Sequence, residues 1–187
     1  MEGLFKSTLP ARIKAGKKNV IVYFSGHGMA ADNDAKLLPV DARPNTAAVT
    51  GYSRNALMDQ LASLGVNSTV ILDACYTGTS KDGAALIEGK PIFKAPKGAF
   101  VPKNVTLISA SSDNQIAWMD GEKGHSLMTY YLLKGLEGLA DSNNDRQIDS
   151  KEIARYLKTS VNNAALILHE QPQEPEVKGI NQLLLSY

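Results

Sequence analysis

The stretch VILDACYTG, residues 70–78, holds the only cysteine of this 187-residue chain. Its apolar start is typical of a buried β-strand, and the acid Asp73 and the thiol Cys75 follow at the end of that strand. Cys75 is therefore either a small core residue or a nucleophile. Side chains two positions apart on a strand point to the same face, so Asp73 is predicted to share its face with Cys75.

Two more apolar runs, residues 19–25 and 105–111, predict buried strands like the one over residues 68–74. Helically spaced leucines after the capping residue Ser53 predict a helix that Gly65 ends. Further expected elements are helices over residues 125–140 and 150–161, a short edge element over residues 36–42 and a last strand over residues 180–187. Apolar strands that alternate with helices predict an α/β fold, in which helices cover both faces of a mostly parallel sheet.

Composition restricts the class of protein. Hydrophobic residues make up 43% of the chain and charged residues 21%, and the net charge of +1 leaves no basic excess for binding nucleic acid. No apolar run is long enough to cross a membrane, and a single cysteine permits no internal disulfide. We expect residues 1–187 to form one cytoplasmic domain, with residues 1–18 as a lead-in.

A second reactive side chain follows the first strand. Residues 25–28 read SGHG, and the strand is predicted to stop there, which places His27 at a carboxyl end like that of Cys75. If the two strands are neighbours, the imidazole can take the proton from the thiol and so produce a nucleophile. The backbone N–H groups of Gly28 and Cys75 are then candidates for an oxyanion hole. Taken singly, His27 is as well explained as a turn residue and Cys75 is better explained as a core residue, but together they favour catalysis.

Two stretches resemble the catalytic motifs of a known family. VYFSGHG and, roughly 50 residues later, LDACYTG are similar to those of caspase-like cysteine peptidases (clan CD, peptidase family C14), especially the metacaspase-type and bacterial caspase-like branch. LLPVDA, LISASSDNQIAW, GHSLMTYYLLKGL and EQPQEPEVKG resemble further segments of bacterial members. The resemblance implies a caspase-like three-layer sandwich and a cysteine endopeptidase acting on proteins or peptides. His27 would be its general base and Cys75 its nucleophile, and the chemistry would need no cofactor.

The resemblance also gives Asp73 a role in specificity. Caspases proper carry glutamine at this position and cut after acidic residues, whereas metacaspase-like members with Asp cut after Arg or Lys. A carboxylate beside the nucleophile attracts a cation and repels an acid, so we expect cleavage after Arg or Lys. Asp73 would instead, or in addition, accept backbone N–H groups of the loop after Cys75. Asp113 and Gln115 match the family region that helps to line this pocket, although a capped turn explains them equally well.

Residues 81–103 lack any periodic pattern and are rich in Gly, Pro and Lys, which predicts an exposed loop. Family members often cleave their own chain at this place. Four lysines of the loop, Lys81, Lys90, Lys94 and Lys97, are candidate self-cleavage sites for an enzyme selective for basic residues. A solvated surface loop without processing explains the pattern equally well.

DSNNDRQIDSKE, residues 141–152, resembles an EF-hand calcium loop between two helices. The oxygen ligands expected from that pattern are those of Asp141, Asn143, Asp145, the Gln147 carbonyl, Asp149 and Glu152. The sixth position carries Arg146 where glycine is expected, and a non-glycine residue in that conformation costs about 1 kcal/mol or more. A polar loop that connects two helices is the favoured explanation, with calcium binding as the alternative.

The chain departs from the family ahead of its first strand. Family members place a strand, a helix and a strand there, and the residues before Asn19 are too few to form them. An exposed sheet edge is therefore expected, with self-association or fusion to other domains. The main alternative function is a catalytically weak or inactive caspase-like module that acts through protein–protein association. Trp118 is expected to pack or to wall the cleft and His125 to start a helix, and no role is evident for His169.

Overall fold

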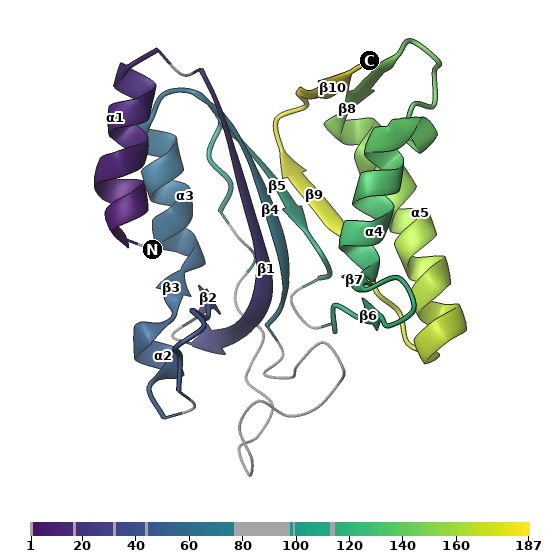
Figure 1. The fold of residues 1–187 in the computed structure, drawn as a ribbon, viewed down its shortest axis with the longest axis horizontal. Helices are drawn as coiled ribbons and strands as arrows, with labels where there is room; N and C mark the ends of the chain where they lie inside the picture. The colour runs from purple at the N-terminus through teal and green to yellow at the C-terminus, as the bar shows by residue number, and fades with distance from the viewer. Residues whose placement is uncertain are drawn as a thin grey trace.

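A computed structural model describes residues 2–16, 18–31, 33–43, 45–76, 98, 100–112 and 115–187. In this part of the chain the main sheet has six strands in the order β3-β2-β1-β4-β5-β9 (Figure 1). Their bounds are β1 (Asn19–Ala31), β2 (Asp34–Leu37), β3 (Tyr52–Ser53), β4 (Asn67–Cys75), β5 (Val105–Ser109) and β9 (Glu176–Gly179). Strands β1, β4 and β5 run parallel, while β2, β3 and β9 pair antiparallel beside them. The expected α/β fold is confirmed, and its parallel strands form the centre of a mixed sheet.

The sequence predicted that strand β1 stops at SGHG, but the strand continues to Ala31. Residues 28–31 pair antiparallel with β2 across a tight turn, in which Asn33 takes a φ of 58° that asparagine tolerates well. The parallel pairing of β1 with β4 nevertheless ends at His27. His27 therefore lies where β1 changes neighbours. Among the described residues, the half of β1 before this point has no strand on its other edge.

Helices cover both faces of the sheet (Figure 1). They are α1 (Leu9–Lys14), α2 (Ala47–Thr50), α3 (Arg54–Ser63), α4 (Leu127–Lys134) and α5 (Ser150–His169), with π-helical segments η1 (Leu4–Thr8) and η2 (Gly135–Leu139). Side chains of β4 alternate between the two faces. Val70 and Leu72 lie in the core beside α3, whereas Cys75 lies in the core that α4 and α5 form. The thiol is therefore on the face covered by the two C-terminal helices.

The lead-in expected over residues 1–18 contains a helix, η1 followed by α1. Phe5 is buried, and Leu9 and Ile13 pack against the same core cluster. Their spacing of four residues places them on one side of a helix, which is the signal that would have predicted it. This segment therefore belongs to the core.

The predicted helices form with the expected capping residues. The Ser53 hydroxyl accepts the N–H of Ala56 at 3.0 Å and so caps α3, and Gly65 ends that helix with a φ of 66°. The helix predicted over residues 125–140 consists of α4 and η2, which contains Gly138 at a φ of 118°. On α5, Ile153 and Leu157 are fully buried, as its amphipathic pattern predicts.

The last strand forms but does not join the main sheet. It is β10 (Leu183–Ser186), and it pairs with β8 (Gln147–Asp149) beside the acidic loop. Strand β9, which the sequence did not predict, closes the main sheet against β5 instead. A short hairpin pairs β6 (Met119–Asp120) with β7 (His125–Ser126). Among the described residues, no helix is both long and apolar enough to cross a membrane.

Candidate active site

The parallel pairing of β1 and β4 brings His27 and Cys75 side by side. They are direct partners in the register and form the last pair of this ladder. Residues paired in this way present their side chains to the same face of the sheet. His27 is exposed, whereas only 1% of Cys75 is accessible. An imidazole at the surface thus lies next to a covered thiol.

The sulfur of Cys75 contacts a segment distant in sequence, residues 115–118, which we name the active-site strap. The backbone N–H of Ala117 donates to Sγ, with 2.9 Å between nitrogen and sulfur. The thiol in turn lies 3.5 Å from the Ala117 carbonyl oxygen and donates to it. An N–H donor favours the thiolate over the thiol because it stabilises negative charge on sulfur. The strap therefore acts directly on the reactive atom.

Gly28 lies tightly against the backbone that follows β4. A Cβ atom at this position would be 2.7 Å from the Cys75 carbonyl oxygen and 2.7 Å from the Tyr76 ring. Such distances are far inside van der Waals contact, so only glycine fits without a backbone shift. The close approach keeps the main chain of Gly28 beside that of Cys75, which is the arrangement that a shared oxyanion hole requires.

Asp73 is fully buried and anchors the start of α4. Its Oδ2 accepts hydrogen bonds from the hydroxyls of Ser126 and Thr129, the latter at 2.5 Å. Because the Thr129 hydroxyl donates to Asp73, the Tyr23 hydroxyl 2.9 Å away donates to Thr129. Ser126 is the N-cap of α4, and a carboxylate there also meets the positive end of the helix dipole. These hydroxyl donors come from the N-cap and the first turn of α4. The loop after Cys75, whose backbone N–H groups were the alternative expected, lies beyond Tyr76 and outside the described residues, so that alternative stays a prediction.

Gln115, which was predicted to help line the substrate pocket, lies in the strap. Its side-chain Oε1 accepts the N–H of Glu174 at 2.8 Å, so this amide ties the strap to the segment before β9. Asp113 lies outside the described residues. The same holds for the candidate self-cleavage sites Lys81, Lys90, Lys94 and Lys97. Substrate contacts of Asp113 and Gln115 stay predictions.

Sequence reasoning missed Gln173, which is fully buried at the back of the strap. Its Oε1 accepts the N–H of Trp118 at 2.9 Å, and its Nε2 donates to the Ala110 carbonyl at 2.8 Å. The residue stands in EQPQEPEVKG, a stretch whose family resemblance was clear but whose chemistry was not. Nothing local in that stretch indicates a partner more than 50 residues earlier, so only the fold reveals this contact.

Trp118 packs against His169, which gives that histidine a role. The two rings stack with centroids 4.5 Å apart and planes 8° from parallel, and His169 Nε2 lies 3.0 Å from the Met119 carbonyl oxygen. His125 lies in β7, and the following residue, Ser126, is the one that caps α4. The packing interpretation of Trp118 is therefore the one that its contacts favour.

The acidic loop satisfies its own backbone. Asp141 Oδ2 accepts the N–H of Arg146 at 3.0 Å, Asn143 Oδ1 that of Asp145 at 2.9 Å, and Asp145 Oδ1 that of Gln147 at 2.8 Å. Arg146 adopts a φ of 61°, the conformation for which the calcium pattern uses glycine. Within the described residues, which include this whole loop, no three acidic, histidine or cysteine side chains are grouped to hold a metal ion. Calcium binding stays a prediction.

The end of this loop forms the capping box of α5. Asp149 Oδ1 accepts the N–H groups of Lys151 and Glu152, each at 2.9 Å, and Glu152 Oε2 accepts the N–H of Asp149 at 3.2 Å. Burial tends to raise the pKa of Asp149, but the hydrogen bonds from Asn181, Glu152 and Lys151 outweigh it and hold this pKa below its ordinary value. Asp149 and Glu152, two of the proposed calcium ligands, thus already stabilise the start of α5.

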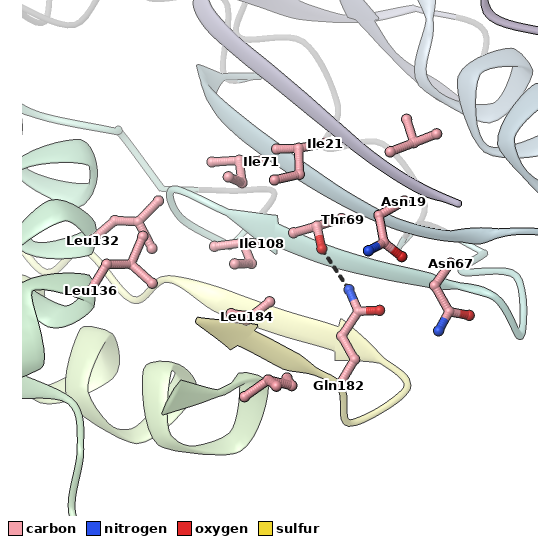
Figure 2. A pocket seen from close by; sticks show the side chains of 12 residues that line it. Asn19, Ile21, Asn67, Thr69, Ile71, Ile108, Leu132, Leu136, Gln182 and Leu184 are labelled. Atoms are coloured by element: carbon pink, nitrogen blue, oxygen red, sulfur yellow. Dashed lines mark hydrogen bonds between the residues drawn. The ribbon is translucent and has the colours of Figure 1, made fainter. Parts of the chain in front are cut away.

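A cavity of about 290 Å³ lies away from these residues. Figure 2 shows it between the amino ends of β1 and β4, which begin at Asn19 and Asn67, and the segment around Gln182. Gln182 Nε2 donates to Thr69 Oγ1 at 2.5 Å there. His27 and Cys75 end the same parallel ladder that begins at Asn19 and Asn67, so this cavity is at the opposite end of the strands and outside the candidate active site.

Comparisons with known proteins agree with this geometry. Residues 9–182 match the family model of the caspase domain, peptidase family C14. The fold is similar to that of caspase-1 from Spodoptera frugiperda, at a TM-score of 0.52 and 14% identity over 95% of this chain and 68% of that one. A second structure, of pro-Sf-caspase-1, gives a TM-score of 0.49 and 15% identity over 95% of this chain and 70% of that one. No curated protein matches significantly. Since the family model spans most of the chain, this protein belongs to the caspase family and is a cysteine endopeptidase.

Proposed function

We propose that the protein cleaves peptide bonds with a His27–Cys75 dyad. The pairing of these residues at the end of the β1–β4 ladder is the observation that carries this proposal. His27 takes the thiol proton, the thiolate attacks the scissile carbonyl, and the N–H groups of Gly28 and Cys75 stabilise the oxyanion. The leaving amine then receives the proton from His27. Water, deprotonated by His27, hydrolyses the acyl-enzyme and regenerates the thiol.

We further propose that Asp73 directs cleavage to bonds after Arg or Lys. Asp73 lies two residues before Cys75 on β4 and carries a carboxylate on the same face of the sheet. A buried carboxylate ringed by hydroxyls attracts a guanidinium or ammonium group, and it opposes an acidic substrate side chain.

Peptides with a fluorogenic leaving group after Arg, Lys or Asp test both proposals. We expect wild type to turn over the Arg and Lys peptides and Cys75→Ala to turn over none. Asp73→Asn preserves an acceptor for the Ser126 and Thr129 hydroxyls but removes the charge, so cleavage after Arg should fall about ten- to hundredfold. Asp59→Asn, an exposed acid on α3, is the matched control.

Faster cleavage after Asp than after Arg would reject the specificity proposal and leave the dyad intact. No turnover of any peptide by wild type would instead favour a caspase-like module that acts through association with other proteins.

The candidate self-cleavage sites belong to the same proposal. An enzyme that cuts after Lys can process its own chain at Lys81, Lys90, Lys94 or Lys97. Incubating wild type and Cys75→Ala and sequencing the fragments decides this. Fragments that begin after one of these lysines, in wild type only, are expected, whereas the same fragments from both proteins would reject self-processing.

We also propose that copies of the chain associate, or that the domain is fused to others, in the cytoplasm. Support comes from residues 19–27 of β1, which have no second neighbouring strand among the described residues; we name this the free half-edge. Its side chains include no Lys, Arg, Asp or Glu of the kind that keeps edge strands apart. Sedimentation of the purified protein tests association. A monomer with a cooperative melt at high temperature would oppose it.

A further inference from the structure

The active-site strap is held by the backbone N–H groups of two consecutive residues. That of Ala117 donates to Cys75 Sγ at 2.9 Å, and that of Trp118 donates to Gln173 Oε1 at 2.9 Å. The Trp118 N–H shares one planar peptide with the Ala117 carbonyl, whose oxygen lies 3.5 Å from Sγ, and the Ala117 N–H belongs to the peptide before it. The two peptides meet at the Ala117 Cα, so a bond that fixes one of them restrains the other. The position of the donor on sulfur is thus linked to the hydrogen bond that Gln173 makes.

Gln173 is suited to fix this position. It is fully buried, and both ends of its amide are bound, since Nε2 donates to the Ala110 carbonyl directly after β5. Its own N–H donates to Asn162 Oδ1 on α5 at 3.3 Å. The side-chain amide therefore joins the end of the central sheet to the strap, and the backbone N–H of the same residue joins both to helix α5. The two side-chain bonds need a donor and an acceptor on one planar group. Among neutral side chains of this length only glutamine provides both.

We propose that Gln173 is a positioning residue of the peptidase, which holds the strap so that the Ala117 N–H stabilises the Cys75 thiolate. This proposal rests on the role of Cys75 as nucleophile. Gln173 does not touch the sulfur; it acts through the Trp118 N–H and the peptide before it. Without Gln173 the strap keeps its bond to Glu174 at Gln115 but loses the bond next to Ala117. The Ala117 donor then no longer stays on Sγ, and the thiol loses its proton at higher pH.

Alkylation by iodoacetamide as a function of pH measures this effect without any peptidase activity. The chain has a single cysteine, so the reaction, followed by mass spectrometry, reports on Cys75 alone. The variants are Gln173→Leu, which keeps the size of the side chain but removes both hydrogen bonds, and Gln171→Leu, an exposed glutamine two residues earlier, as the matched control. Thermal melts establish that each is folded.

We expect Gln173→Leu to move the midpoint of the alkylation profile up by about one pH unit, so that below the midpoint it reacts about tenfold more slowly than wild type. Its kcat for an Arg peptide should fall with little change in KM, because thiolate, not substrate binding, is lost. Gln171→Leu should match wild type in both. A folded Gln173→Leu with the wild-type midpoint would overturn the proposal.

A measurement on wild type covers the case in which Gln173→Leu does not fold. The amide protons of Ala117 and Trp118 should exchange slowly with solvent, and exchange as fast as that of exposed amides would overturn the proposal. The role of Gln173 and the peptidase activity can also fail separately. This would be seen if Gln173→Leu shifts the alkylation midpoint while wild type cleaves no peptide. Gln173 would still control the thiol, and the proposed peptidase would be wrong.

Discussion

The active-site rim and the acidic loop both carry side chains with reactive or metal-binding groups, but these side chains are bound in different ways. The rim consists of the ends of β1 and β4, with His27, Asp73 and Cys75, and the loop consists of residues 141–152. At the rim, Asp73 is bound by Ser126 and Thr129, 53 and 56 residues later, and Cys75 by Ala117, 42 residues later. In the loop, oxygens of Asp141, Asn143 and Asp145 accept backbone N–H groups two to five residues away. The distant donors there, the Tyr187 hydroxyl and Asn181 Nδ2, add to bonds that are already local. Convergence of distant segments creates a site for chemistry, whereas local bonds of this kind shape a turn.

The largest effect expected from this comparison is loss of turnover in His27→Ala. A general base contributes a factor of about 10²–10⁴, so kcat/KM for an Arg peptide should fall by that much. His125→Ala, an exposed histidine in β7, is the control and should keep wild-type activity. Equal activity of the two variants would show that His27 is not the general base.

The next largest effect is on stability. Asp73→Ala leaves the Ser126 and Thr129 hydroxyls without their buried acceptor, which costs about 2 kcal/mol, or roughly 4–8 °C in Tm. Asp145→Ala, at an exposed position in the loop, should lower Tm by only a small part of that. Calorimetry at neutral pH compares them, and a larger loss from Asp145→Ala would reverse the ranking of the two regions.

The stability of the fold should depend on pH through the charge of Asp149, at the end of the acidic loop. The pKa of Asp149 is lowered in the folded protein, so its ionised form stabilises the fold above the ordinary pKa of about 4. This contribution is lost as the pH falls through the lower, folded value. Asn caps helices as well as Asp does, so Asp149→Asn should match wild type at low pH and melt earlier at neutral pH. A difference in Tm between wild type and Asp149→Asn that is the same at every pH would contradict this.

Calcium should have the smallest effect. The loop oxygens already accept backbone N–H groups, and Arg146 brings a positive charge to the place where an ion would sit. Millimolar calcium chloride should therefore shift Tm by less than about 1 °C relative to magnesium chloride at equal ionic strength. A rise of several degrees that Asp141→Asn abolishes would restore the calcium interpretation and make the two regions alike.

Sequence patterns predicted the parts of this molecule that depend on short-range chemistry. The apolar strands, the Ser53 cap and the pairing of His27 with Cys75 all follow from local composition and from the rule that parallel strands end together. The continuation of β1 past Gly28 was missed because antiparallel pairing with β2 outweighs the turn tendency of the glycines. Gln173 was missed for a different reason: its partners are set by tertiary contacts, which leave no periodic signal along the chain.

The free half-edge of β1 has a measurable consequence for hydrogen exchange. Along residues 19–27 successive N–H groups point alternately towards β4 and away from it, since a strand alternates its edges residue by residue. The exchange rates of the amide protons in this half should therefore alternate between slow and fast from one residue to the next. From Gly28 on, β4 no longer pairs and β2 pairs with the other edge, so the slowly exchanging amides should be those that point towards β2. The pattern places His27, the proposed catalytic histidine, where the paired edge of β1 changes, and any partner that covers the other edge of residues 19–27 would slow the fast amides there.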